Sequence, residues 1–397
     1  MGGGLLQLVT TGVQDAYITG NPQITFFKSV YRRHTMFSME TIPISFNGNA
    51  NFNNKVSAII PRNGDLISKM VLKIKLPAVS SSSNLWEGYV NNIGHALIQQ
   101  VEIKIGGQLI DRHYSNWLDI YDEIYDSPEQ RKLLSKFKTN TTLRTNNSAR
   151  TVYIPLKFWF CNNPGLALPL IALQYHEIEL NIIFNPLQQL VKSNAAFTSP
   201  TGSFVDTSIL VDYIYLDTDE RRRFAQSSHE YLIEQVQFGG AENISSTDTT
   251  KNIELTFNHP CKALHWVFVT NTNSAQNSIT GNNNFCYSSL SNGSLYSSLY
   301  LLFNGQQRFR VQDEDYFRLE QHINHFSRIP DKYIGSYSFA LKPLENQPSG
   351  TANFSKIDKA TMCFTINSGE SKLLYIYAVN YNILRIMSGM GGLGYAN

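Results

Sequence analysis

Two His-Glu pairs, at residues 176–177 and 229–230, have the residue types of a zinc hydrolase site. In the H-E-x-x-H pattern, two histidines on one helix face bind zinc and the glutamate acts as a general base. The positions where the second histidine should stand hold Leu180 and Ile233, so neither pattern is completed. The sequence therefore predicts no zinc hydrolase chemistry at either pair.

His322 and His325 lie three residues apart on a predicted helix and form another candidate metal site. Glu320 or Asp315 could add an oxygen ligand, but no third ligand stands at a spacing typical of metal sites. Histidines on the surface or in an interface explain this pair better than metal ligands do. We therefore predict no metal in this protein.

The C-terminal glycines Gly389, Gly391 and Gly394 match the G-x-G-x-x-G fingerprint of dinucleotide-binding sites. That fingerprint needs a following helix whose N-terminus binds pyrophosphate, and only three residues follow Gly394. A tail that is flexible or docked at an interface is the better interpretation. The sequence also has no G-x-S-x-G nucleophile elbow. We predict no catalytic residues, no cofactor and no enzyme activity.

Arginines are clustered at residues 221–223 and 32–33. The triplet follows Asp217, Asp219 and Glu220, which neutralise it locally. Ion pairs between the two halves of the chain, or between neighbouring subunits, are therefore favoured for it. The formal net charge is only +2, from 33 Lys and Arg against 31 Asp and Glu. Because such a balance creates no long-range field of one sign, we expect no direct binding to nucleic acid.

The elements that must position these residues are mostly short strands. Apolar and polar residues alternate, with many β-branched and aromatic side chains, in the runs 69–77, 96–105, 151–160, 175–184, 208–216, 263–270 and 360–366. A period of two is typical of half-buried antiparallel strands. Helical patterns are few, at 111–124, 127–137 and 311–323. The whole predicts an all-β sandwich or barrel with helices in the connections.

The same order of elements occurs twice along the chain. A strand, the turn Gly106-Gly107 and an acidic-aromatic helix follow one another in residues 101–124, and residues 299–323 repeat this order around Asn304-Gly305. Both turns are expected to need positive φ and to occupy matching places in two copies of one unit. Roughly 185–200 residues per copy suit a jelly roll. We predict two tandem eight-stranded jelly-roll β-sandwiches with short helices in the connecting loops.

This duplication predicts that the chain is divided into three parts. Residues 1–24 are an N-terminal segment, residues 25–217 the first jelly roll and residues 218–397 the second. The longest apolar run, residues 373–379, is too short to span a bilayer, so a soluble chain is expected.

Several long and unusual strings of the sequence carry a resemblance to one protein family. They are GGLLQLVTTGVQDAYITGNPQITFFKSVYRRHT near the N-terminus, RNGDLI (62–67), GHALIQQVEIKIGGQLID (94–111), IPLKFWFCNNPGLALPLIALQYHE (154–177), LDTDERRRFAQSSHEYLIEQ (216–235), YSFALKPLENQPSGTANFSKID (337–358) and the closing YAVNYNILRIMSGMGGLGYAN. These strings run from end to end of the chain. They resemble the major capsid protein of nucleocytoplasmic large DNA viruses.

The resemblance implies a structural major capsid protein with two tandem jelly rolls. It implies a homotrimer that forms a pseudo-hexagonal capsomer and tiles the icosahedral shell of a large double-stranded DNA virus. The partners it implies are neighbouring capsomers, minor capsid proteins and penton proteins, with an indirect association with an internal viral membrane. The location it implies is the virion capsid, assembled in the host cytoplasm.

The N-terminal segment is the candidate for joining copies. Leu5, Leu6 and Leu8 stand among glycines, which makes it too apolar for a free tail and too glycine-rich for a stable helix. We expect this assembly segment to lie beneath the jelly rolls and to contact minor capsid proteins or neighbouring capsomers.

Two alternative functions remain compatible with this sequence. A double jelly-roll scaffold protein of immature particles would have the same fold and the same trimer. A carbohydrate-binding jelly-roll protein would use exposed aromatic residues as sugar platforms, and the candidates are Tyr287, Tyr296 and Trp86.

Overall fold

The computed structural model describes residues 2–79, 87–127, 149–193, 202–275, 283 and 285–395. The chain divides into two compact units, Met1–Met36 and Phe37–Asn397. We call the described part of the first unit the N-terminal arm, and the second unit the body. The helix predicted at 127–137 lies outside the described residues, apart from its first position. Within those residues, no helix is long and apolar enough to cross a membrane.

The N-terminal arm contains two short helices, α1 (Gly3–Val9) and α2 (Ala16–Thr19). The Thr10 hydroxyl donates to the Leu6 carbonyl oxygen over 2.9 Å at the end of α1. The expectation that this segment is too glycine-rich for a helix was therefore wrong, because α1 also contains three leucines and a glutamine, which are good helix formers. All side chains of the arm are exposed except that of Asp15, which is half-buried.

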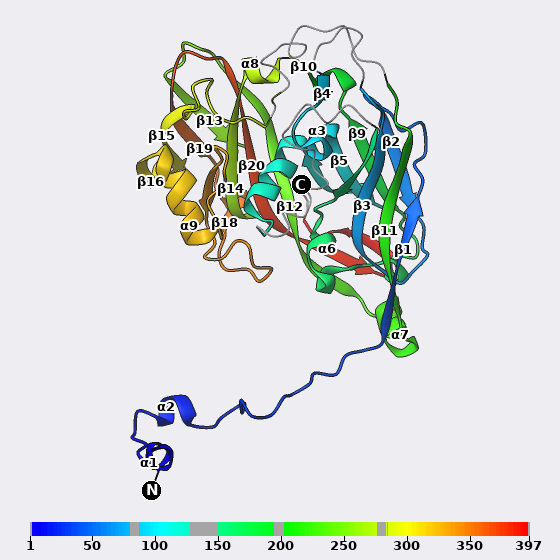
Figure 1. The fold of residues 1–397 in the computed structure, drawn as a ribbon, viewed down its shortest axis with the longest axis vertical. Coiled ribbons are helices and arrows are strands. Elements are labelled where there is room, and N and C mark those ends of the chain that lie inside the picture. The colour runs from blue at the N-terminus through cyan, green and yellow to red at the C-terminus, as the bar shows by residue number, and fades with distance from the viewer. Residues whose placement is uncertain are drawn as a thin grey trace. The chain divides into compact units, whose positions relative to one another are not determined.

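Two antiparallel sheets form the first sandwich of the body (Figure 1). One sheet has the strand order β1-β11-β3-β7, with the short β8 paired to β3, and the other has the order β2-β9-β5-β6. A separate pair joins β10 to β4. The bounds are β1 (Phe37–Ile44), β2 (Lys55–Ile60), β3 (Leu66–Leu76), β4 (Glu87–Tyr89), β5 (Ile98–Ile105), β6 (Gln108–Tyr114), β7 (Arg150–Pro155), β8 (Leu168–Pro169), β9 (Ile178–Phe184), β10 (Val191–Ser193) and β11 (Asp206–Leu216).

The second sandwich repeats the order of the eight main strands, and the short β21 pairs in addition with β20. Its sheets have the orders β12-β20-β14-β17 and β13-β19-β15-β16, and the short β18 pairs with β14 as β8 does with β3. The bounds are β12 (His229–Ile244), β13 (Thr250–Leu255), β14 (Pro260–Thr270), β15 (Tyr296–Phe303), β16 (Gln306–Asp313), β17 (Gly335–Ser338), β18 (Ala352–Asn353), β19 (Ala360–Ile366), β20 (Lys372–Met387) and β21 (Met390–Leu393). Eight main strands in each sandwich confirm the two predicted jelly rolls.

Short helices lie in the connections, as predicted. They are α3 (Ile93–Leu97), α4 (Ser115–Ile124), α6 (Trp159–Asn162), α7 (Thr218–Gln226), α8 (Asn271–Ser274), the π-helical turn η5 (Tyr316–Glu320), α9 (Gln321–His325) and the 3-10 turns η2 (Pro164–Leu166), η3 (Leu170–Ala172), η4 (Leu187–Gln189) and η6 (Phe354–Lys356). The helix predicted over 111–124 begins only at Ser115, because residues 108–114 pair with β5 as strand β6. The helix predicted over 311–323 likewise begins late, since residues 311–313 belong to β16.

The two predicted turns close equivalent hairpins. Gly106 and Gly107 have φ of +57° and +81° between β5 and β6, and Asn304 and Gly305 have φ of +49° and +81° between β15 and β16. Positive φ at both central residues matches the right-handed twist of the flanking strands and favours Gly or Asn. The prediction that both turns need positive φ and occupy matching places is confirmed.

Alternation along β14 divides its side chains between two apolar clusters. Trp266 and Phe268 pack in the core of the second sandwich, whereas Val267 and Val269 belong to a cluster that also contains the core of the first sandwich. Because both faces of the strand are covered, every residue from Cys261 to Thr270 is buried. We call the contact between the two sandwiches the seam.

Candidate assembly site and the seam between the sandwiches

The seam joins an edge of the first sandwich to a sheet face of the second. Strand β6 and helix α4 supply the edge, and strands β12, β20 and β14 supply the face. Aromatic rings line the contact, with Trp117 of α4 and Tyr377 of β20 having ring centroids 5.6 Å apart. Tyr114 of β6 lies 4.9 Å from Phe238 of β12 in an edge-to-face arrangement. The seam is therefore packed like a domain core and not like a loose interdomain contact.

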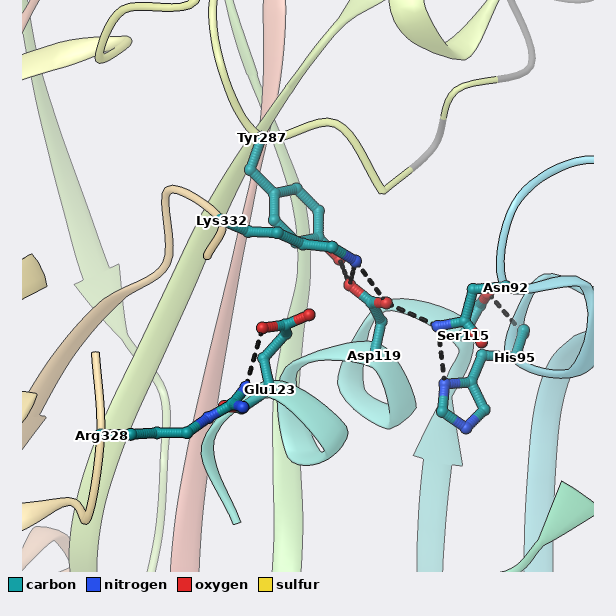
Figure 2. A network of polar contacts seen from close by, with 8 residues as sticks. All are labelled: Asn92, His95, Ser115, Asp119, Glu123, Tyr287, Arg328 and Lys332. Atoms are coloured by element: carbon teal, nitrogen blue, oxygen red, sulfur yellow. Dashed lines mark hydrogen bonds and ion pairs between the residues drawn. The ribbon is translucent and has the colours of Figure 1, made fainter. Parts of the chain in front are cut away.

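Asp119 of α4 is the centre of a buried polar network in the seam (Figure 2). Its two carboxylate oxygens each lie 2.6 Å from Nζ of Lys332, which comes from the second half of the chain. Tyr287 donates its hydroxyl hydrogen to Asp119 over 2.9 Å, and Asn92 donates from Nδ2 over 2.7 Å. Burial and the neighbouring carboxylate hold the pKa of Tyr287 well above its ordinary value, so the hydroxyl remains a donor.

Glu123 forms the second ion pair of the network, one helical turn after Asp119. Arg328 donates from Nη2 to the Glu123 carboxylate over 3.0 Å and from Nε to the Glu123 carbonyl oxygen over 2.7 Å. Two acidic side chains on one face of α4 therefore contact two cations of the second half of the chain. The sequence analysis missed this constellation. Its one signal was the spacing of two acids, four residues apart, on the polar side of an amphipathic helix.

Tyr125 and His265 extend the polar contacts of the seam. The Tyr125 hydroxyl lies 2.9 Å from Nε2 of His265, and Nδ1 of the same ring lies 2.7 Å from the Ser336 hydroxyl. Burial lowers the pKa of His265 well below its ordinary value, with further contributions from nearby His322 and Lys262. The ring is therefore neutral at pH 7 and acts as a hydrogen-bonding link between the sandwiches.

The C-terminal glycines allow the hairpin β20–β21 to lie closely against the first sandwich. The Tyr175 amide donates to the Gly389 carbonyl oxygen over 3.0 Å, and the Leu393 amide donates to Gln108 over 3.2 Å. A Cβ at Gly389 would stand 2.6 Å from the Tyr175 ring, and one at Gly391 would stand 2.6 Å from a Leu173 methyl. The glycines of the G-x-G-x-x-G match therefore let the backbone of the C-terminal hairpin lie close to the first sandwich. This agrees with the interpretation of a docked tail.

Three of the remaining sequence candidates, His176, His229 and Arg221, have structural contacts. Nδ1 of His176 lies 2.8 Å from the Gly391 carbonyl oxygen, and Nε2 of His229 lies 2.8 Å from that of Phe224. Arg221 forms a 3.0 Å ion pair with Asp65 and so ties α7 to the first sandwich.

The histidines of α9 do not both behave as predicted. His322 is not a surface histidine: it is fully buried, and Nδ1 lies 2.9 Å from the Arg318 carbonyl oxygen. Nδ1 of His325 lies 3.2 Å from the Leu341 carbonyl oxygen. The described residues contain no cluster of three His, Cys, Asp or Glu side chains placed to hold a metal ion.

Two of the three residues predicted as sugar platforms lie among the described residues, and for both of them the prediction is wrong. Tyr287 and Tyr296 are only 2% and 4% exposed, because the first lies in the seam and the second in the core of the second sandwich. Trp86 lies outside the described residues. A buried ring face cannot stack on a sugar, so these tyrosines do not support carbohydrate binding.

Comparison with known proteins agrees with this architecture over the whole chain. The family profile described as the major capsid protein N-terminus matches residues 25–217, and that described as the large eukaryotic DNA virus major capsid protein matches residues 220–392. The chain is 45% identical to the major capsid protein of Pyramimonas orientalis virus over 427 aligned positions, and both chains are fully covered.

Solved structures give the same result. VP54 of PBCV-1, in a crystal structure fitted into a reconstruction of the virophage Sputnik, is 38% identical with a TM-score of 0.84, covering 94% of this chain and 100% of VP54. A quasi-atomic structure of the PBCV-1 virus capsid gives a TM-score of 0.83 at 37% identity, with the same coverage. The chain belongs to the major capsid protein family of large eukaryotic DNA viruses, and is therefore a structural, non-enzymatic protein of the virion capsid.

Proposed function

We propose that three copies of this protein form a pseudo-hexagonal capsomer that tiles an icosahedral shell. The observation that carries the proposal is the repetition of one topology in two sandwiches that a buried seam joins into one body. Three such chains present six similar walls, so an object with three-fold symmetry can pack in a nearly hexagonal net. The similarity to a protein of the PBCV-1 virus capsid supports this assembly.

The proposed partners follow from a place in such a shell. They are neighbouring capsomers, minor capsid proteins and penton proteins, with an indirect association with an internal viral membrane and assembly in the host cytoplasm. We also propose the division into residues 1–24, 25–217 and 218–397. Helix α7 supports a boundary near residue 218, since it begins at Thr218 and is capped by the Asp217 side chain.

The solution mass of the purified protein tests the trimer. One chain has a mass of 45.0 kDa, so light scattering should give 3 × 45.0 = 135 kDa. Negative-stain images of the same peak should show hexagonal tiles. A single species of 45.0 kDa at every protein concentration would contradict the proposed capsomer.

Deleting residues 2–20 should leave the trimer intact and prevent shell formation. The arm leaves Leu5, Leu6 and Leu8 exposed, at 55–75% of their surface, which is unfavourable unless a partner covers them. The measurement is the yield of shells by electron microscopy when the variant is expressed with the other capsid components. A matched control replaces the same residues with a Gly/Ser segment of equal length. Normal shells from both variants would refute an assembly role for the arm.

A scaffold protein of immature particles would have the same fold and the same trimer, but the family of this chain places it in the virion capsid. Quantitative mass spectrometry of purified mature virions separates the two functions. The shell protein should dominate the virion protein mass, and a scaffold protein should be nearly absent.

A further inference from the structure

A polar cleft with a volume of about 310 Å³ opens between the two sandwiches at one end of the seam. The first sandwich supplies residues of β5, β6, α4 and η4 to it, and the second supplies residues of β14, α8 and β20. In Figure 1, α8 and β10 lie at the end of the body opposite to α7. Because Phe37 pairs with Leu216 just before α7, the arm leaves the body at that other end. The volume of the cleft is at the lower end of the range for small-molecule sites, about 300–1,000 Å³.

Amide side chains dominate the lining of this cleft. None of the described residues that line it is charged, and four of them are Asn or Gln, namely Gln99, Asn116, Asn185 and Gln189. We call the cleft lined by these four residues the amide cleft. An amide group offers two donor hydrogens and an acceptor oxygen, whereas an ammonium group only donates and a carboxylate only accepts. A hydroxyl group also both donates and accepts, so the lining suits a neutral ligand with many hydroxyl groups.

Most of the hydrogen-bonding capacity of these amides is unused within the protein. Asn185 donates from Nδ2 to the Ala96 carbonyl oxygen over 2.7 Å. Among the described residues, the side chains of Gln99, Asn116 and Gln189 have no such partner. Gln99 is exposed and the other two are half-buried, so water can bind all three in the free protein. A ligand that carries hydroxyl groups can replace this water without a loss of hydrogen bonds.

Two tyrosines add aromatic surface to the amide cleft. Tyr114 and Tyr375 are half-buried, and both pack on Phe238 of β12. The Tyr114 ring meets Phe238 edge-to-face at 4.9 Å, and the Tyr375 ring stacks on it at 5.9 Å. This packing fixes both rings before a ligand arrives, which lowers the entropy cost of binding. The C–H groups of a sugar ring are apolar and can pack on such rings while its hydroxyl groups contact the amides.

We infer that the amide cleft binds a neutral sugar unit of a glycan. The absence of charge from the described lining, the unused amides and the fixed tyrosine rings together carry this assignment. It goes beyond the proposed capsomer and does not depend on it. The same chemistry has two sources, a glycan on a cell surface and a glycan attached to a protein of the virion.

Titration calorimetry and saturation-transfer NMR with defined sugars test the inference. The probes are the trisaccharides of glucose, galactose, mannose and xylose, and the matched trisaccharides of glucuronic, galacturonic and mannuronic acid. The protein is the full chain made in bacteria, in the oligomeric state in which it is purified. At least one neutral trisaccharide should bind once per chain, and its uronic acid counterpart, where the panel contains one, should bind at least about tenfold more weakly. The assignment is overturned by a panel in which no neutral sugar binds, or in which the acids bind equally well.

Substitutions in the lining locate the bound sugar. Asn116→Ala and Gln189→Ala should each weaken binding by about tenfold, since each removes hydrogen bonds to the ligand. The matched control is Asn252→Ala, at an exposed position of β13 that does not line the cleft, and it should bind like the parent. Melting temperatures of the three variants should equal that of the parent, because none of these side chains is buried. A sugar that binds all three variants equally well would lie elsewhere on the protein.

Protein purified from virions separates the two sources of the glycan. Affinity equal to that of the bacterial protein assigns the ligand to a surface outside the virion. Binding that appears only after glycosidase treatment assigns it to a glycan of the virion itself. Failure of this inference is also distinct from failure of the proposed function. A trimer that binds no sugar overturns only the amide cleft, and a monomer that binds sugar overturns only the capsomer.

Discussion

Replacing Asp119 with alanine is expected to lower the free energy of unfolding of the body by about 3–5 kcal/mol. The carboxylate is only 1% exposed, and it accepts hydrogen bonds from Lys332, Tyr287 and Asn92. Its removal leaves an ammonium group and a hydroxyl in the seam without their acceptor, which costs more than the pair contributes when intact. The measurement is denaturant unfolding of the parent and the variant, monitored by tryptophan fluorescence. The midpoint and the slope of each curve give the free energy of unfolding.

A surface ion pair provides the matched control for this substitution. Lys342 and Glu345 lie 2.9 Å apart, but their side chains are 66% and 56% exposed. Water screens such a pair, so Glu345→Ala should change the free energy of unfolding by less than about 1 kcal/mol. Asp119→Asn keeps the shape and one acceptor, and should fall between the two. Equal midpoints for Asp119→Ala and Glu345→Ala would show that the network does not stabilise the seam.

Lowering the pH from 7 to 4 should destabilise the body by about 3 kcal/mol through His322 alone. Burial lowers the pKa of His322 from 6.5 to about 4, and the nearby Arg318 and Arg328 guanidinium groups act in the same direction. The folded-state pKa lies below the unfolded value, so between them the unfolded state binds more protons. Stability is therefore intact above about pH 6.5, falls as the pH is lowered, and has lost this whole contribution near pH 4. Burial of His265 in the seam adds to the loss in the same direction.

Unfolding free energies measured between pH 7 and pH 4 test this linkage. The slope of the unfolding free energy against pH gives the number of protons taken up on unfolding. His322→Gln should reduce this number by about one between pH 6.5 and pH 4, even if the variant is less stable at pH 7. His325→Gln, in the same short helix, is the control for substituting a histidine there. Parallel curves for His322→Gln and the parent would show that His322 does not carry the acid sensitivity.

Local patterns predicted much of the fold because they depend on neighbours along the chain. A period of two in residues 175–184 and 360–366 predicted strands, which the structure contains as β9 and β19. Gly and Asn marked the two hairpin turns because few other residues adopt positive φ. Helix starts were predicted less well, since residues 111–114 have an amphipathic pattern but pair with β5 across the sheet.

The burial of each face was decided by contacts between distant parts of the chain. Asp119 and Lys332 are 213 positions apart, and nothing near either residue indicates its partner. The aromatic residues Tyr287 and Tyr296 resembled exposed sugar platforms, and His322 resembled a surface residue, until packing enclosed them. The two copies of the jelly roll likewise differ where their sequences predict the same elements: β6 is covered by the second sandwich and β16 is not. Strand propensity depends on the local sequence. Which surface of a sandwich becomes buried depends instead on the three-dimensional arrangement of the two sandwiches.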